Sequence, residues 1–450
     1  MREMAWPAAT LDEYEKLVIR MNTPRVVIDN GVCPDVTLIK VDSARKHGIL
    51  LEAVQVLTDL DLSIRKAYIS SDGRWFMDVF HVSDSSGRKL ADESLVSFIE
   101  HSLAAADSNL DEQTEDASRL LTTLELTGTD RPGLFSELCA VLSDLDFAIA
   151  DASVWTYNGR AAALVTIEGL ESGSSVGDTD KIALVTTRLR NVLNRDHDLR
   201  GAKTSVSTAA VGHADRRLHQ LMLADRDYES AAVASASASS SRPSVTVQNW
   251  TERGYSVVGV QCRDRPKLLF DVVCTLTDME YVIFHGTVDT GSDRAHLELY
   301  VRHLDGSPIR SEAERQRVIQ CLQAAIERRA TEALRLELCT RDRQGLLADV
   351  TRTFRENGLS ITRAEIRTKE QMAMDTFYVT DAAGNPANPK TIDAVVDRVG
   401  RDSLKVVQDR PSRPIAKDRS AAEEMGAGLF YLGSLVKRNL YNLGLIRSCS

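Results

Sequence analysis

Short turns that combine an aspartate with a glycine recur just ahead of helical stretches, and they are where this sequence places its chemistry. A helix N-terminus leaves several backbone N–H groups unpaired and carries the positive end of the helix dipole. Glycine at such a turn lets the backbone approach a ligand closely. An amino-acid carboxylate fits those amides, and the nearby aspartate accepts its ammonium group. The candidate ligand-binding residues are Asp130, Arg131, Gly133, Leu134, Asp264, Asp342, Gly345, Leu346 and Gly48.

The same residues also have a purely structural interpretation. Asp130 and Asp342 are placed to cap their helices, which is worth about 1 kcal/mol each, and Pro132 is placed to preset a first helical turn. Two turns depart from the pattern, because Arg45 occupies the aspartate slot of the first and Lys267 replaces the glycine of the third. We therefore expect the second and fourth turns to be the better binding sites.

These turns belong to an internal repeat. Four segments of about thirty-five residues align without a gap, and they begin at Gly48, Gly133, Lys267 and Gly345. An isoleucine lies sixteen residues after the start of each repeat: Ile64, Ile149, Ile283 and Ile361. A small residue lies nineteen residues after the same start: Ala67, Ala152, Gly286 and Ala364. Agreement at fixed offsets is typical of a repeated structural unit.

Each repeat predicts the same order of elements. An alternating strand, clearest over 334–338, leads through the turn into an amphipathic helix. Two strands divided by turn residues such as Asn158-Gly159 follow, then a second helix such as 311–329 and a short last strand such as 404–407. This β-α-β-β-α-β order predicts an α+β protein of four ferredoxin-like domains. Because each domain is small, we expect the domains to pair side by side through their sheets.

The repeat spacing also sets the expected domain boundaries. The longest gap holds a charged helical stretch (213–229) and a Ser/Ala-rich tract (230–244), which predicts two tandem pairs joined by a flexible tether. The expected parts are an N-terminal segment (1–33), domain 1 (34–107), domain 2 (118–207), a charged helix and linker (208–252), domain 3 (253–332), domain 4 (333–412), and a polar linker with an apolar tail (413–450). We expect the tail to dock against the repeats or across a homodimer rather than on a membrane surface.

At the level of phrases, the repeats resemble ACT domains, and the whole chain resembles the plant ACT-domain-repeat family. The phrases that carry the resemblance are TGTDRPGLF (127–135), CRDRPKLLF (262–270), CTRDRQGLLADV (339–350), RRLHQLMLADRDYE (216–229) and YNLGLIRS (441–448). The units are also similar to the regulatory ACT domains of bacterial uridylyltransferases, here without a catalytic half. The resemblance implies ferredoxin-like folding, paired sheets, amino-acid sites where domains meet, and sensing rather than catalysis.

Composition excludes several other classes of protein. The formal net charge of −10 argues against a nucleic-acid scaffold. No apolar run is long enough for a membrane span, and the first residues lack the apolar core of a secretory signal. Seven scattered cysteines fit reduced thiols in the cytoplasm or the nucleus. The Gly-x-Gly-x-x-Gly, His-Glu-x-x-His and Gly-x-Ser-x-Gly motifs are absent, so we expect no cofactor, no metal site and no catalytic residue.

These observations predict a non-enzymatic regulator that binds a small amino acid between domains and signals through an unidentified protein partner, as a homo-oligomer. One alternative is a constitutive interaction scaffold without a ligand. A second is an RNA-binding protein of the same topology, which needs paired aromatic residues on the central strands and a basic surface.

Overall fold

The computed structural model describes residues 25–44, 48–71, 75–104, 122–169, 179–194, 201–207, 213–229, 242–291, 293–330 and 333–407. The apolar tail (428–450), most of the Ser/Ala-rich tract (230–241) and Arg45 lie outside the described residues.

The second and fourth domains have the predicted β-α-β-β-α-β order. The second consists of β5 (Thr122–Thr129), α4 (Leu134–Asp144), β6 (Phe147–Tyr157), β7 (Arg160–Gly169), α5 (Thr179–Leu193) and β8 (Lys203–Ser207). The fourth consists of β13 (Leu334–Arg341), α9 (Leu346–Glu356), β14 (Leu359–Lys369), β15 (Met372–Asp381), α10 (Pro389–Val399) and β16 (Leu404–Val407). Helix α6 (Ala214–Ala224) follows the second domain, as its charged sequence predicts.

In the first and third domains the outer edge strand comes before the repeat instead of after it. The first consists of β1 (Arg25–Asp29), β2 (Thr37–Ala44), α2 (Ile49–Asp59), β3 (Ser63–Ser70), β4 (Trp75–Ser83) and α3 (Glu93–Ala104). The third consists of β9 (Ser244–Trp250), a 3-10 turn η2 (Thr251–Arg253), β10 (Tyr255–Arg263), α7 (Leu268–Asp278), β11 (Tyr281–Asp289), β12 (Arg294–His303) and α8 (Glu312–Glu327). Strands β1 and β9 pair antiparallel with β2 and β10. In the structure, these two domains include edge strands that begin at Arg25 and Ser244, before the predicted starts at residues 34 and 253.

The four domains pair through their sheets, which confirms the predicted α+β class, but the tandem pairing that we expected is wrong. One eight-stranded sheet has the order β1-β2-β4-β3-β11-β12-β10-β9, and the other has the order β16-β13-β15-β14-β6-β7-β5-β8. The first domain therefore pairs with the third and the second with the fourth, in two units whose division falls inside α8, after Ile319. Each domain offers an equivalent strand edge, so the repeat pattern carries no signal for which domains pair.

The small residues nineteen positions into each repeat lie where two domains join. Ala152 faces Ile366 and Ala364 faces Val154 across the β6–β14 pair. In the other unit, a Cβ atom added to Gly286 would lie 2.7 Å from Leu299 Cδ2. A larger residue at these positions has no room beneath the helices that pack over the junction.

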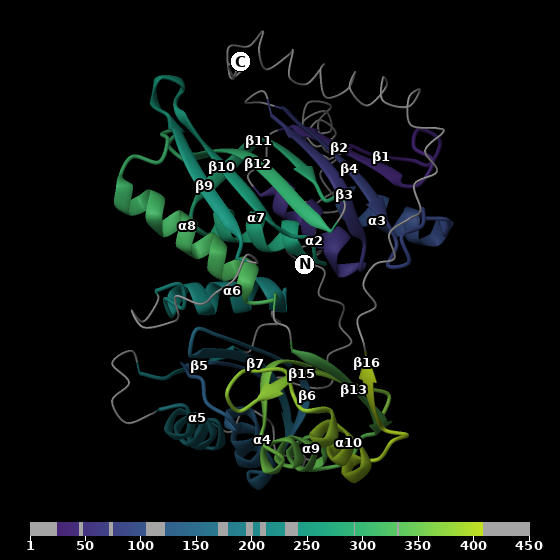
Figure 1. Cartoon of the computed structure of the whole chain (residues 1–450), viewed down its shortest axis with the longest axis vertical. Coiled ribbons are helices and arrows are strands. Elements are labelled where there is room, and N and C mark those ends of the chain that lie inside the picture. The colour runs from purple at the N-terminus through teal and green to yellow at the C-terminus, as the bar shows by residue number, and fades with distance from the viewer. Residues whose placement is uncertain are drawn as a thin grey trace, which may run out of the picture. The chain divides into compact units, whose positions relative to one another are not determined.

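In the unit built from the second and fourth domains, helices cover both faces of the sheet (Figure 1). Helices α4, α5, α9 and α10 lie along one face over a single apolar core that runs through both domains. Helix α6 lies on the opposite face, where Leu218 and Met222 pack against Trp155 and Leu164. Coverage on both faces explains why β5 is buried at seven of its eight positions, against the alternating burial of a one-sided strand.

Candidate functional site

The turn of the second domain connects β5, which ends at Thr129, to α4, which begins at Leu134. Gly133 is the N-cap residue with φ of 83°, and no side chain caps the helix. Gly345 has the same role before α9, with φ of 75°. The interpretation of Asp130 and Asp342 as helix caps is therefore wrong, because the glycine that each precedes occupies the cap position.

All four repeats keep this left-handed cap. Gly48 has φ of 96° before α2, and Lys267 has φ of 65° before α7. A left-handed conformation costs a residue with a Cβ about 1–2 kcal/mol relative to glycine. The third repeat therefore accepts strain to retain the turn, although the glycine is lost.

The second-domain turn borders a cavity of about 20 Å³, which is room for about one water molecule. Four predicted site residues line it: Asp130, Arg131, Gly133 and Leu134. The fourth domain supplies Phe354, Arg355, Leu359 and Ile361, so the cavity lies between two domains as the resemblance implies. The remaining predicted residues do not line it: Asp264, Asp342, Gly345, Leu346 and Gly48.

Two alanines that we did not single out in the sequence leave this space open. Ala161 and Ala163 lie on β7 beneath α4 and line the cavity. The repeat alignment places Leu297 and Asp375 at the position of Ala163. The replacement of a larger core residue by alanine removes packing volume. This difference between the repeats was therefore the sequence signal for a cavity in the second domain.

The charged groups at this turn are arranged around the half-buried Asp130. Burial is the main effect on this carboxyl and raises its pKa to about 6, although the Thr156 hydroxyl donates a hydrogen bond to it. Arg131 donates to Glu137 at 2.9 Å and to the Val192 carbonyl oxygen at 3.1 Å. This contact lowers the pKa of Glu137 and raises that of Arg131. Of the acidic groups at this turn, Asp130 and Glu137, Asp130 is thus the closer to losing its charge, and a cationic ligand group favours the charged form.

The turn of the fourth domain faces the second domain in the reciprocal way. A Cβ atom added to Gly345 would lie 3.6 Å from the Ser143 hydroxyl of α4. Gln344 donates to Asp146 at 3.3 Å, and the Asp342 N–H donates to the Gln371 carbonyl oxygen at 2.7 Å. Both turns of this unit therefore lie at the junction of the two domains, with different residues opposite them.

The turn of the third domain has an arginine of the first domain nearby. Burial raises the pKa of Asp264, and the positive charge of Arg65 on β3 opposes that rise. The Asp264 N–H donates to the Asp293 carbonyl oxygen at 3.0 Å. In the first domain, a Cβ built on Gly48 meets no atom within 4 Å among the described residues beyond its chain neighbours.

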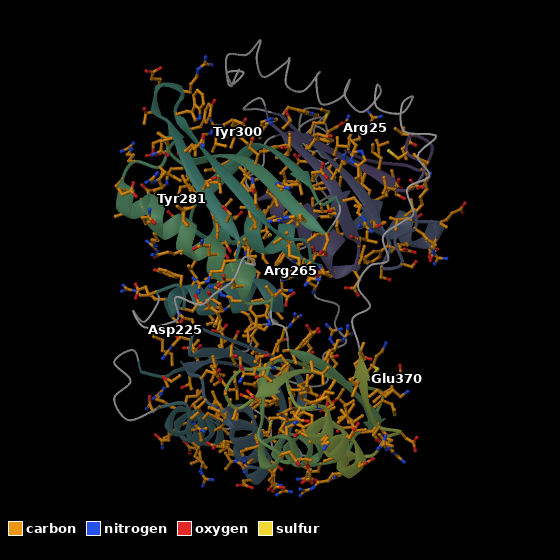
Figure 2. All side chains as sticks on the ribbon, in the orientation of Figure 1. Arg25, Asp225, Arg265, Tyr281, Tyr300 and Glu370 are labelled. Atoms are coloured by element: carbon orange, nitrogen blue, oxygen red, sulfur yellow. The ribbon has the colours of Figure 1, made fainter. Side chains whose placement is uncertain are left out.

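The segment after α6, which was predicted from the sequence as part of a charged helical stretch (213–229), contains a second group of functional interest. Asp225, labelled in Figure 2, holds Arg160 at 2.5 Å, and both side chains are buried. Arg160 also donates to the Thr129 hydroxyl at 3.0 Å, and the Gly159 carbonyl accepts the N–H of Asp130 at 2.9 Å. The β6–β7 hairpin and the segment after α6 thus position the start of the turn between β5 and α4. Alternation of Asp and Arg at 225–227 was the only sequence signal for this arrangement.

No group of three or more His, Cys, Asp or Glu side chains within the described ranges is arranged to hold a metal ion. Among the helices that the structure describes, none is long and apolar enough to cross a membrane.

The fold and three family models define the class of protein as a chain of ACT domains. Residues 32–109 match the ACR family N-terminal ACT domain, residues 244–336 match the ACR9-like, ACT-like domain, and residues 334–395 match the ACT domain. The match from residue 244 includes β9, in agreement with its place in the third domain.

Full-length relatives identify the family within this class. The ACT domain-containing protein ACR8 of Arabidopsis thaliana is 58% identical over 98% of this chain and 99% of its own. ACR4 and ACR5 of the same plant are 51% and 48% identical, over 98% and 97% of both chains. The chain belongs to the plant ACT-domain-repeat family.

Proposed function

We propose that this protein is a non-enzymatic regulator that binds an amino acid at the cavity between the second and fourth domains. The observation that carries the proposal is the cavity itself, which joins a helix N-terminus, the half-buried carboxyl of Asp130 and an apolar interior. The first-turn amides of α4 suit a carboxylate, and Asp130 suits an ammonium group. Leu126, Val154 and Leu193 line the interior, so an aliphatic side chain suits it best.

The proposed mechanism is linkage between ligand and domain arrangement. A ligand that contacts both domains favours the arrangement in which the two walls are correctly spaced. At about 20 Å³ the cavity holds less than an amino acid, so binding requires side chains to move apart. We propose that a protein partner reads this change, that the protein acts as a homo-oligomer, and that it works in the cytoplasm or the nucleus without a cofactor.

The RNA-binding alternative has less support in the second domain. RNA-recognition domains stack bases on exposed aromatic residues of the central strands. Trp155 on β6 is only 1% exposed, because α6 covers that face of the sheet. The constitutive scaffold remains the main alternative, since it uses the same paired sheets and needs no ligand.

Calorimetric titration of the full chain with each of the twenty amino acids tests the proposal. Ala163→Leu introduces the residue that the third repeat has at this position and fills the cavity, so we expect it to abolish binding. Ala295→Leu is the matched control, because Ala295 is a buried strand residue of the other unit. Absence of heat with all twenty amino acids favours the scaffold, and binding that survives Ala163→Leu places the site elsewhere.

A further inference from the structure

One helix position differs in chemical type between the repeats and lies directly over the neighbouring turn. Ten residues after the cap position, three repeats have a small hydroxyl residue and the fourth has an arginine: Thr58, Ser143, Thr277 and Arg355. Ser143 is the residue opposite Gly345, and Arg355 is the residue opposite Gly133. The two turns of this unit therefore have the same backbone conformation but face different chemical groups.

The side chain of Arg355 covers the second-domain turn. A Cβ atom added to Gly133 would lie 2.5 Å from Arg355 Cδ and 2.9 Å from Cγ, so the arginine stem occupies the space that glycine leaves. Arg355 is also one of the residues that line the cavity. The side chain is 43% exposed, which gives it room to move without disturbing the core.

The ionic contact of Arg355 is a weak one. Its Nη1 atom lies 3.7 Å from Glu137 Oε1. Arg131 already donates to that oxygen at 2.9 Å and binds the second carboxylate oxygen as well. Because Glu137 has a closer partner, a change of partner costs Arg355 little. A guanidinium group binds a carboxylate through two parallel N–H donors.

We propose that Arg355 is the specificity-determining residue of the second-domain site: its side chain closes the empty pocket and its guanidinium binds the carboxylate of the incoming amino acid. The inference rests on the proposed function. The fourth-domain turn, which faces Ser143, lacks this selection for a free carboxylate. The second-domain site is therefore specific for the acid form of its ligand.

The test compares the twenty L-amino acids with their C-terminal amides, titrated into the full chain and into Arg355→Ser and Arg355→Lys. Arg355→Ser introduces the hydroxyl that Ser143 has at the equivalent position. Arg352→Ser is the matched control, since Arg352 lies on the same helix, is 56% exposed and pairs with Asp349 outside the cavity. Thermal unfolding of each variant checks that the fold is retained.

We expect the wild type and Arg352→Ser to prefer the acid over its amide. A charge-assisted contact of this kind is worth roughly tenfold or more in affinity. Arg355→Ser should lose most of that preference by weakening acid binding alone, and Arg355→Lys should retain part of it. An equal loss of acid and amide binding, or a gain of both, overturns the proposal and leaves the proposed function standing. Absence of binding to the wild type overturns the proposed function itself.

Discussion

The ion pair between Asp227 and Arg328 gives a prediction whose size follows from its burial. Asp227 accepts two hydrogen bonds of 2.6 Å from Arg328, and the two side chains are 0% and 1% exposed. Arg328 also contacts His219 Nδ1 at 2.8 Å. Two charges without solvent contact depend on each other, because removal of one leaves the other buried and uncompensated.

Asp227→Asn should therefore destabilise the unit formed by the second and fourth domains by about 3–5 kcal/mol. That loss is a large share of the roughly 5–15 kcal/mol that stabilises a typical domain. Glu229→Gln is the control, since Glu229 pairs with Arg226 at 3.6 Å with side chains 43% and 67% exposed. A surface pair of this kind is worth about 0–1 kcal/mol.

Urea unfolding followed by tryptophan fluorescence measures both variants, because Trp155 lies in the same unit beneath α6. The double variant Asp227→Leu with Arg328→Met should recover most of the loss, since a well-packed apolar pair often replaces a buried ion pair without cost. If Asp227→Asn loses no more stability than Glu229→Gln, the pair is not buried as described and the reasoning fails.

Three further predictions concern the sheets. Burial raises the pKa of Asp375 to about 7 from its ordinary value of 3.8. The folded state therefore binds a proton that the unfolded state has lost, and the free energy of unfolding falls as pH rises from about 4 to 7. In urea unfolding, Asp375→Asn should be more stable than the wild type at pH 8, and this gain should be gone near pH 4. Gly286→Val should cost its unit about 1–3 kcal/mol by crowding Leu299, and an unchanged melting temperature contradicts the close packing. Ser153 and Glu365 face each other across β6 and β14, so the double variant Ser153→Cys with Glu365→Cys should form a disulfide on oxidation. A gel shift detects this disulfide. If the domains pair in tandem instead, the two cysteines stay reduced.

The sequence was sufficient for the features that depend on local chemistry. The turn at Gly133 requires a positive φ, and the isoleucine and small residue at fixed offsets define the strand that follows. Domain pairing depends on which equivalent edges meet, and the repeats do not encode it. The outer strands were missed because β1 and β9 precede their repeats, although the short apolar run at 25–29 and the alternating stretch at 244–250 were visible.

The sequence predicted the turn residues of the candidate site but not the cavity residues that lie on other elements. Asp130 and Gly133 line the cavity as expected, but the residues that distinguish this turn from the other three lie on other elements. Ala163 leaves the space open, and Arg355 lies more than two hundred residues away in the chain. Their importance follows only from the pairing of the second domain with the fourth.

Comparison of the four repeats separates positions that hold the fold from positions that are free to define a ligand. The left-handed cap persists in all four repeats, even where Lys267 must adopt it with strain. The position ten residues later varies in type, as Ser143 and Arg355 show. In the unit formed by the second and fourth domains, Ser143 and Arg355 each lie against the turn of the neighbouring domain. Under the proposed function, divergence at this position gives the two turns of one unit unlike binding chemistry with the same backbone conformation.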